Sequence, residues 1–264
     1  MKAEIHARGL RSIRLRFFAA LLPPGGAAWL AWLDRPAAAA LFFVTGFTVM
    51  TIGTLMPRCA LFGRMIKRLP PGPNHALLTI DDGPHPEHTP VILDLLDRHG
   101  LKAVFFLIGD RAAAHPHLVR EILVRGHEIG NHTQTHPATT FWALRPRHLW
   151  REIATCQETL TRLCPESPPR FFRPPAGHHN IFLPAITRAL GLRILMWDAR
   201  GFDGVRTDVE KITRRIRERL KPGSIVLIHE ATPVAVEVAE AVAALFEPGR
   251  LASADPSKLA FSDD

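Results

Sequence analysis

The sequence predicts an α/β protein in which a parallel-sheet domain follows a membrane segment. Beyond residue 74, short apolar runs typical of buried strands alternate with amphipathic stretches typical of helices. This repeated spacing favours parallel strands joined by crossover helices. Polar motifs follow several of the apolar runs. In such sheets, binding and catalytic residues lie at the carboxyl ends of the strands.

The charge of the chain is unevenly distributed. The 264 residues are 47% hydrophobic and 22% charged, which is typical of a folded protein, and the net charge is +8. Residues 1–70 hold ten of the 33 basic residues but two of the 25 acidic ones, so 23 of each remain after position 70. The larger part of the chain is therefore balanced. It lacks the basic surface expected of a nucleic-acid-binding domain.

Two uncharged stretches near the N-terminus predict insertion into a membrane. Residues 36–57 are long enough to cross a hydrocarbon core, which requires about 20 apolar residues. Residues 17–33 are also uncharged but contain Pro-Pro-Gly-Gly. This first stretch is compatible with a short span, a re-entrant helix or the core of a signal peptide.

The charges that flank these two stretches favour a helical hairpin. Five basic residues precede the pair, four follow it, and Asp34 and Arg35 alone separate its members. Under the positive-inside rule both flanks prefer the cytoplasm, and a two-span hairpin satisfies this preference. We therefore expect an inner-membrane protein, in contact with the lipid bilayer, whose larger domain is cytoplasmic. The alternative, a signal peptide followed by one span, places the domain outside.

The chain divides into three predicted parts: residues 1–70 with the membrane segment, residues 71–250 as the domain, and residues 251–264 as a disordered tail. The tail lacks the closing strand expected for such a domain. Within the domain, the apolar runs predict strands over 75–80, 102–108, 192–197 and 224–228, and the amphipathic stretches predict helices over 90–99, 117–125, 147–163, 208–220 and 233–246.

Two adjacent carboxylates, Asp81 and Asp82, follow the first predicted strand and precede Gly83-Pro84. Both cannot point into an apolar core. One interpretation is a turn and helix cap, because Asp is favoured in both places. The other is a pair of functional carboxylates at a strand end.

Two histidines four residues apart, His132 and His136, predict a metal site. In a helical turn both imidazoles project from the same side. With one carboxylate they form a set of two histidines and one acid, which leaves positions open for water and substrate. Zinc hydrolases and non-haem iron oxygenases both use such a set. The alternative is two surface histidines in a chain that has 14.

Three further motifs contain candidate functional residues. Arg173 lies between two phenylalanines and Pro-Pro, a fixed position suited to holding a carboxylate or, alternatively, a surface bend. Asp198 and Asp203 follow a predicted strand, and each is either functional or a cap for the helix that begins near Asp208. His229 ends the strand SIVLI, where a structural role is equally compatible with the pattern.

In order along the chain, these motifs resemble the five motifs of the NodB-type polysaccharide deacetylases, carbohydrate esterase family four. The resemblance covers residues of about 75 to 230. It implies a distorted (β/α) barrel that removes N- or O-acetyl groups from chitin oligomers, peptidoglycan and related sugars. It also implies a divalent metal, with zinc expected and cobalt, iron or manganese as alternatives.

The resemblance assigns a role to each matching residue. Asp81 matches the general base, Asp82 the metal-binding carboxylate, and His132 and His136 the metal-binding histidines. Arg173 matches the arginine that orients the base.

On the opposite side of the implied site, Asp203 matches the aspartate that tethers the catalytic histidine, His229. Leu227 matches the residue that lines the acetyl pocket. The backbone N–H near Ala176 matches the donor to the oxyanion.

Three positions depart from the family pattern. Ala176 replaces a tyrosine, Gly204 stands where a tryptophan is frequent, and Arg200 where an aspartate is frequent. These changes affect the sugar groove rather than the metal centre. We therefore expect an N-deacetylase of a chitooligosaccharide or a cell-envelope saccharide. The alternatives are a deacetylase or deformylase of an isoprenoid-linked sugar and a non-catalytic carbohydrate-binding relative.

Overall fold

The computed structural model describes residues 22–56, 61–70, 74–246 and 251–259. The chain divides into two compact units that alternate along the sequence. The first unit contains Met1–Arg64, Pro137–Arg151 and Pro174–Leu192, and the second contains Met65–His136, Glu152–Arg173 and Arg193–Asp264.

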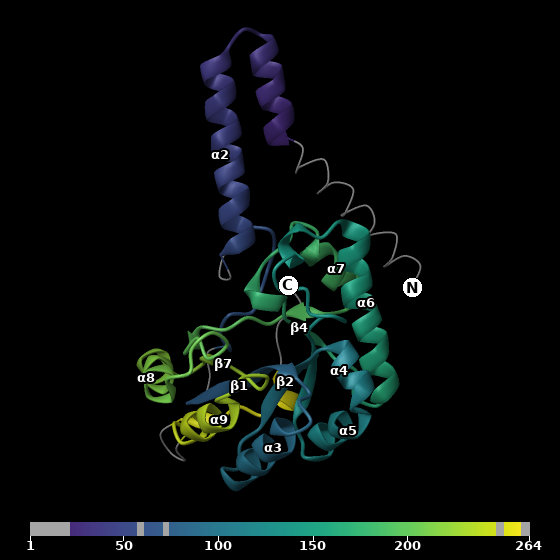
Figure 1. Ribbon diagram of the computed structural model, residues 1–264, viewed down its shortest axis with the longest axis vertical. Coiled ribbons are helices and arrows are strands. Elements are labelled where there is room, and N and C mark those ends of the chain that lie inside the picture. The colour runs from purple at the N-terminus through teal and green to yellow at the C-terminus, as the bar shows by residue number, and fades with distance from the viewer. Residues whose placement is uncertain (1–21, 57–60, 71–73, 247–250, 260–264) are drawn as a thin grey trace. The chain divides into compact units, whose positions relative to one another are not determined.

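The second unit is built on one sheet of eight strands, all of whose pairings are parallel. The strand order is β5-β4-β3-β2-β1-β7-β6, and β8 also pairs with β1; Figure 1 labels β1, β2, β4 and β7. The strands are β1 (His75–Gly83), β2 (Ala103–Leu107), β3 (Glu128–Asn131), β4 (Phe171–Phe172), β5 (Arg193–Ile194), β6 (Ala199–Arg200), β7 (Ile225–His229) and β8 (Ala252–Ser253). The α/β class predicted from the sequence is confirmed.

The register of the central strands aligns their polar ends. Asp81 of β1 is paired with His229 of β7, and Leu107 of β2 is paired with Asn131 of β3. Because every strand runs in the same direction, the residues that follow these positions collect at one edge of the sheet. Below that edge β1, β2 and β7 are almost wholly buried, as expected for parallel strands covered on both faces.

Amphipathic helices bury their apolar stripes against this sheet. In α3 (His88–Arg98) the buried positions include Ile92, Leu93 and Leu96, and α9 (Ala235–Ala243) contributes similar apolar residues to the same core. The side chain of Asp208 accepts from the backbone N–H of Lys211 and caps the N-terminus of α8 (Val209–Arg219). The other helices of this unit are α4 (Gly109–Ala114) and α5 (Pro116–Val124), and α6 (Pro146–Leu163) contributes to both units.

In the first unit, the two uncharged stretches form two helices joined by a tight turn. One helix covers residues 22–32, and α2 runs from Pro36 to Leu55 (Figure 1). A Cβ atom at Gly26 would lie 2.5 Å from the ring of Phe42, and one at Gly46 would lie 2.5 Å from Pro23. The two helices therefore pack closely through glycines, in the manner of helices in membranes. Residues 17–21 of the predicted first stretch lie outside the described residues.

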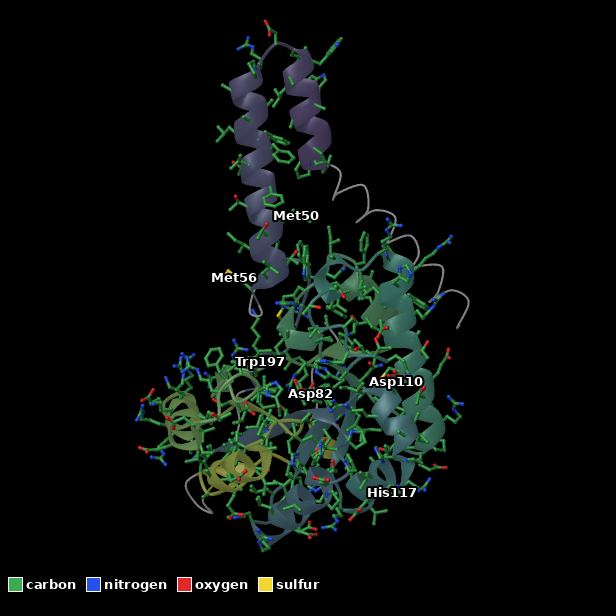
Figure 2. The ribbon with its side chains drawn as sticks, in the orientation of Figure 1. Met50, Met56, Asp82, Asp110, His117 and Trp197 are labelled. Carbon is green, nitrogen blue, oxygen red and sulfur yellow. The ribbon has the colours of Figure 1, made fainter. Side chains whose placement is uncertain are left out.

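The surface of this helical pair is apolar. Figure 2 shows Met50 on α2 and Met56 directly after the end of α2, among side chains that are mostly carbon. Trp29 and Trp32 are 61% and 80% exposed, and Phe47 is 64% exposed. By length and composition, α2 is the one helix among the described residues that is able to cross a membrane, with a mean hydropathy of 1.8.

Several strands are shorter than the sequence predicts. The apolar run 192–197 yields only the two residues of β5, because Leu195 next forms a bridge with Ile66. β4 has two residues, since the Pro-Pro that follows Arg173 offers no N–H groups to continue a ladder. Four strands, β3, β4, β6 and β8, were not predicted.

The disordered tail predicted over residues 251–264 is wrong for the part that the structure describes. β8 extends β1 through Ala252 and Ser253, and a short 3₁₀ turn, η3 (Pro256–Lys258), follows. The Ser253 hydroxyl donates to the carbonyl of Lys102, and the Arg170 guanidinium donates to the carbonyl of Leu259. Polar contacts and the burial of Leu251 and Ala254 hold this segment, which is too short to show an apolar periodicity.

Candidate active site

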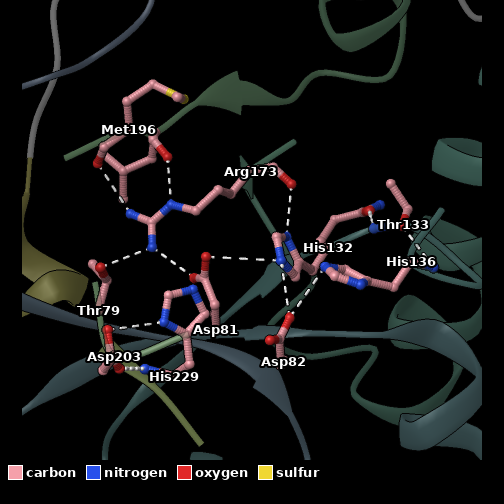
Figure 3. Close-up of polar contacts among 12 residues, drawn as sticks. Thr79, Asp81, Asp82, His132, Thr133, His136, Arg173, Met196, Asp203 and His229 are labelled. Atoms are coloured by element: carbon pink, nitrogen blue, oxygen red, sulfur yellow. Dashed lines mark hydrogen bonds and ion pairs between the residues drawn. The ribbon is translucent and has the colours of Figure 1, made fainter. Parts of the chain in front are cut away.

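The carboxyl edge of the sheet brings together the polar residues of all the motifs in the second unit (Figure 3). Each comes from the end of a strand or from the loop that follows one. They are Asp81, Asp82, His132, His136, Arg173, Asp203 and His229.

Asp81 and Asp82 are adjacent in sequence but face different partners. The Asp81 Oδ1 atom accepts from Arg173 Nη1 at 2.7 Å. The Asp82 Oδ1 atom lies 3.4 Å from Nε2 of His132 and 3.1 Å from Nε2 of His136. The two carboxylates separate because Asp82 has a φ of 70°, a left-handed conformation that Asp tolerates better than most residues.

Asp82, His132 and His136 form a group that fits a metal ion. Their ligand atoms all lie within 4.8 Å of one another, and the buried Asp82 Oδ1 atom has no hydrogen-bond donor among the described residues. A carboxylate oxygen and two imidazole nitrogens are donors that Zn²⁺ and several other divalent metals accept. The ligand set inferred from the sequence is therefore brought together by the fold.

The two histidines do not lie on a helical turn, as the four-residue spacing suggested. His132 follows β3, and the chain then bends through left-handed conformations at Thr133 (φ 71°) and His136 (φ 57°). The Thr133 hydroxyl accepts from the backbone N–H of His136 at 3.1 Å and closes the bend. The imidazoles still converge, with ring centroids 4.8 Å apart.

A backbone carbonyl orients His132. Its Nδ1 atom lies 2.8 Å from the carbonyl oxygen of Arg173, so Nδ1 carries the proton and Nε2 is left free to bind a metal. This contact also ties the metal-binding loop to the residue that contacts Asp81.

The electrostatic environment keeps this group ready for a cation. Burial alone would raise the pKa of Asp82, but the adjacent imidazole of His132 outweighs burial and places the pKa well below its usual range. Burial, reinforced by the neighbouring His132, lowers the pKa of His136 to about 4. At neutral pH the group therefore offers an ionised carboxylate and a neutral His136, which are the protonation states that a metal requires.

Arg173 is fully buried and every polar branch of its guanidinium is engaged. Nε donates to the carbonyl of Leu195 and Nη2 to the carbonyl of Met196, while Nη1 donates to Thr79 and Asp81. Its Cζ atom lies 4.1 Å from the centroid of the Phe106 ring. Burial lowers the pKa of Arg173, and the carboxylate of Asp81 opposes that shift. A buried cation held in this way fixes the orientation of Asp81.

His229 and Asp203 form a second hydrogen-bonded pair. Asp203 Oδ1 lies 3.1 Å from Nδ1 of His229, and Asp203 Oδ2 accepts from the backbone N–H of His229 at 2.6 Å. Burial alone would lower the pKa of His229, but the hydrogen bond and charge of Asp203 raise it to about 9. His229 is therefore protonated at neutral pH, with Nε2 free to donate a proton.

The remaining positions are placed as follows. Leu227 is buried in β7, paired with Thr79 of β1 and Arg200 of β6. A Cβ atom at Gly204 would lie 3.4 Å from the His229 ring, so this glycine leaves the ring face uncovered. Ala176 belongs to the first unit, in a 3₁₀ turn with a φ of 53°.

Sequence reasoning missed three residues near this edge. Thr79 accepts from Arg173 and donates to the carbonyl of Val226, and Arg111 donates to the carbonyl of Asp82. Glu230 is a buried carboxyl directly after His229, at the end of the same sequence motif, SIVLIHE.

Asp198, the other candidate that follows the predicted strand 192–197, does not cap a helix. It accepts from the backbone N–H of Ile225 and forms an ion pair with Arg68, which gives it a structural role.

Comparison with known proteins agrees with this geometry. Residues 68–195 match the polysaccharide deacetylase family model. The chain is 35% identical to a chitooligosaccharide deacetylase of Bradyrhizobium sp. (strain ANU 289) over 162 residues, covering 61% of this chain and 73% of that protein. It is also 35% identical to a peptidoglycan-N-acetylglucosamine deacetylase of Bacillus cereus over 157 residues, covering 58% of this chain and 71% of that protein.

Among solved structures, the chain is similar to a family 4 carbohydrate esterase pseudoenzyme from Bacillus anthracis. The TM-score is 0.66 at 25% sequence identity, covering 74% of this chain and 68% of that one. A curled, parallel (β/α) half-barrel is therefore the fold of this chain's second unit, in agreement with the predicted distorted barrel.

Proposed function

Because the chain belongs to the polysaccharide deacetylase family, we propose that it is a metal-dependent hydrolase that removes N-acetyl groups from an amino-sugar-containing saccharide. One observation carries the proposal. A single sheet edge holds a metal-fitting group, a carboxylate oriented by a buried arginine, and a protonated histidine. Hydrolysis of an amide requires electrophilic assistance, a base and an acid, and each of the three parts suits one of these needs.

Asp82, His132 and His136 are the residues that would hold the metal. Such an ion polarises a carbonyl oxygen and lowers the pKa of a water molecule to about 7. We propose zinc, with cobalt, iron and manganese as alternatives, since two histidines and one carboxylate suit all four.

Asp81 is proposed as the general base. Its Oδ1 atom is held by Arg173, and its Oδ2 atom lies 3.7 Å from Nε2 of His132, beside the metal-fitting group. Oδ2 is therefore the oxygen placed to take a proton from water that attacks the acetyl carbonyl. The buried guanidinium keeps Asp81 from turning away, which preserves the geometry between turnovers.

His229 is proposed as the general acid. Its Nε2–H is available because Nδ1 is paired with Asp203. An amine anion is a very poor leaving group, so cleavage of the C–N bond requires a proton on nitrogen. The two products are then acetate and a free amino sugar. The roles that the family resemblance assigns to Leu227 and Ala176 stay predictions.

Acetate release from N-acetylglucosamine oligomers tests the proposal directly. The full-length protein in detergent should release acetate, lose that activity after chelation, and regain it when zinc is returned. Elemental analysis of the purified protein should find about one divalent metal per chain. Metal-free protein whose activity is insensitive to chelators would contradict the proposal, and metal binding without any hydrolysis would favour a non-catalytic relative such as the Bacillus anthracis pseudoenzyme.

An isoprenoid-linked sugar is a second candidate substrate, which includes deformylation as well as deacetylation. The apolar helical pair supports it, because an enzyme anchored at a bilayer meets lipid-linked saccharides there. The uncovered face of His229 beside Gly204 also leaves room for a substituent near the acid. Comparing acetate and formate release from soluble oligomers and from lipid-linked sugars in vesicles separates the candidates.

We further propose that the helical pair anchors the protein in the inner membrane, with the second unit in the cytoplasm. The basic flanks of the pair support this orientation. A reporter that is active only in the cytoplasm, fused after residue 70, should be active. Activity of a periplasm-specific reporter at the same point would instead place the second unit outside.

A further inference from the structure

Glu230 is a fully buried carboxyl that the proposed chemistry does not use. Its polar groups all face the segment of residues 81–89, which carries Asp81 and Asp82. The backbone N–H donates to the carbonyl of Asp81 at 3.0 Å, and the backbone carbonyl lies 2.7 Å from Nδ1 of His88. The side-chain Oε2 atom accepts from the Thr89 hydroxyl. Glu230 therefore joins the end of β7 to residues 81–89.

The second carboxyl oxygen of Glu230 faces Gly83. Oε1 has no hydrogen-bond partner among the described residues, and a Cβ atom at Gly83 would lie 1.6 Å from it. No side chain fits at position 83 while Glu230 keeps this position. Glycine is thus required next to Asp82 for close approach, and Glu230 supports the backbone directly after the metal-fitting carboxylate.

The support continues through hydrogen bonds on both sides of Gly83. The Thr89 hydroxyl, which donates to Glu230, also accepts from the backbone N–H of His85 at 2.8 Å. The carbonyl of Gly83 accepts from the backbone N–H of Ile108 at 2.8 Å. Asp82 itself has the left-handed φ of 70°, a conformation that persists only where the surroundings hold it.

We propose that Glu230 is a positioning residue that holds Asp82 in its left-handed conformation and so places its carboxylate toward His132 and His136. The inference rests on the proposed metal site. Burying a carboxyl is costly, and an apolar residue would fill the same volume at lower cost. The hydrogen bond to Thr89 and the close approach to Gly83 give the carboxyl a function that an apolar side chain lacks.

Glutamine is a suitable conservative replacement. Burial raises the pKa of Glu230 to about 8, so the native group is largely uncharged at neutral pH. An amide has the same shape, and its oxygen accepts from Thr89 as the carboxyl does. Alanine removes both the hydrogen bond and the volume behind Gly83.

Zinc titration of the full-length protein against a chromophoric chelator tests the inference without any need for activity. Glu230→Ala should weaken zinc binding by about 10- to 100-fold, the range typical when a partner behind a metal ligand is removed. The zinc affinity of Glu230→Gln should stay within about threefold of that of the native protein. Glu240→Ala, which removes an exposed carboxylate on α9, serves as the matched control and should not change affinity.

Different results would contradict the role of Glu230 and the proposed function. Glu230→Ala that is folded by circular dichroism and binds zinc with native affinity would overturn the inference. Should that variant fail to fold, Thr89→Val provides the test: it removes only the hydroxyl, and native affinity in Thr89→Val would equally overturn the inference. Failure of the native protein to bind zinc, cobalt, iron or manganese would contradict the proposed function itself, before any variant is compared.

Discussion

Two histidines at the carboxyl edge of the sheet, His136 and His229, have pKa values shifted in opposite directions. On one side, burial and the neighbouring His132 lower the pKa of His136 to about 4. On the other, the hydrogen bond and charge of Asp203 overcome burial and raise the pKa of His229 to about 9. The same side chain is therefore neutral in one place and protonated in the other at neutral pH, although both belong to a single edge of one sheet.

The partner of each ring accounts for the difference. The ring of His136 is buried beside another imidazole, that of His132, whereas Nδ1 of His229 contacts the carboxylate of Asp203. A neutral ring suits a metal ligand and a protonated ring suits a general acid. The identity of the neighbour, rather than the histidine itself, thus assigns the two roles, and the following changes test that assignment from the largest expected effect to the smallest.

Removing a metal ligand should have the largest effect. His132→Ala deletes the more buried of the two imidazoles, and the remaining ligands should not retain a metal through dialysis. Activity should fall by about 10³-fold or more, since the loss of a bound Lewis acid is worth several kcal/mol. Elemental analysis checks metal content, and His117→Ala, an exposed histidine on α5, is the control. Full metal content in His132→Ala would exclude it as a ligand.

Removing the base should separate metal binding from chemistry. Asp81→Asn keeps the shape of the side chain and leaves Asp82, His132 and His136 in place, so metal content should be unchanged. Its kcat should fall by about 10²- to 10⁴-fold, the usual contribution of a general base. Acetate release under saturating substrate measures this, and near-normal turnover would overturn the assignment of Asp81.

Removing the carboxylate partner of His229, by Asp203→Asn, should change the pH dependence of kcat more than its maximal value. His229 acts only when protonated, so activity should fall as the pH rises through about 9. Asp203→Asn removes the charge that raises the pKa of His229, and burial then lowers it, so the alkaline limb should move to lower pH. The pH dependence of kcat measures the shift. An unchanged alkaline limb in Asp203→Asn would assign the limb to another group.

The sequence identified which residues lie at this edge of the sheet better than it identified the backbone conformations that arrange them. Asp81, Asp82 and His229 were identifiable because a titratable residue follows an apolar run, and His132 because it lies four residues before His136. Parallel strands then bring such positions together whatever the details of the connecting loops. The grouping of these residues at one edge of the sheet was therefore predictable from strand ends and the order of the motifs.

Features that depend on single backbone conformations were not predictable. The bend between His132 and His136 depends on left-handed Thr133, and its four-residue spacing imitated a helical turn. The support of Asp82 by Glu230 depends on the absence of a side chain at Gly83, 147 positions earlier in the chain. The two-residue strands β4 and β6 carry too few positions for any periodicity to mark them.

The smallest expected effect is on the free energy of unfolding, whose dependence on pH has opposite signs for His136 and His229. In the metal-free protein, unfolded His136 takes up a proton below about pH 6.5, whereas folded His136 does so only near pH 4. The unfolded state then binds more protons, so the free energy of unfolding should decrease as the pH falls through this interval. For His229 the folded pKa is raised, so its contribution is complete below about pH 6.5 and is lost as the pH rises through about 9.

Urea midpoints of the metal-free protein across these two intervals measure both slopes. His136→Gln should reduce the acid-side slope and leave the alkaline one, and Asp203→Asn should do the reverse. Each effect should be about 1 kcal/mol, because one pKa unit corresponds to about 1.4 kcal/mol and both rings are partly exposed to solvent. Equal changes of both slopes in either variant would mean that the two histidines titrate as one coupled system, and the separation of ligand from acid would then depend on the bound metal rather than on the protein alone.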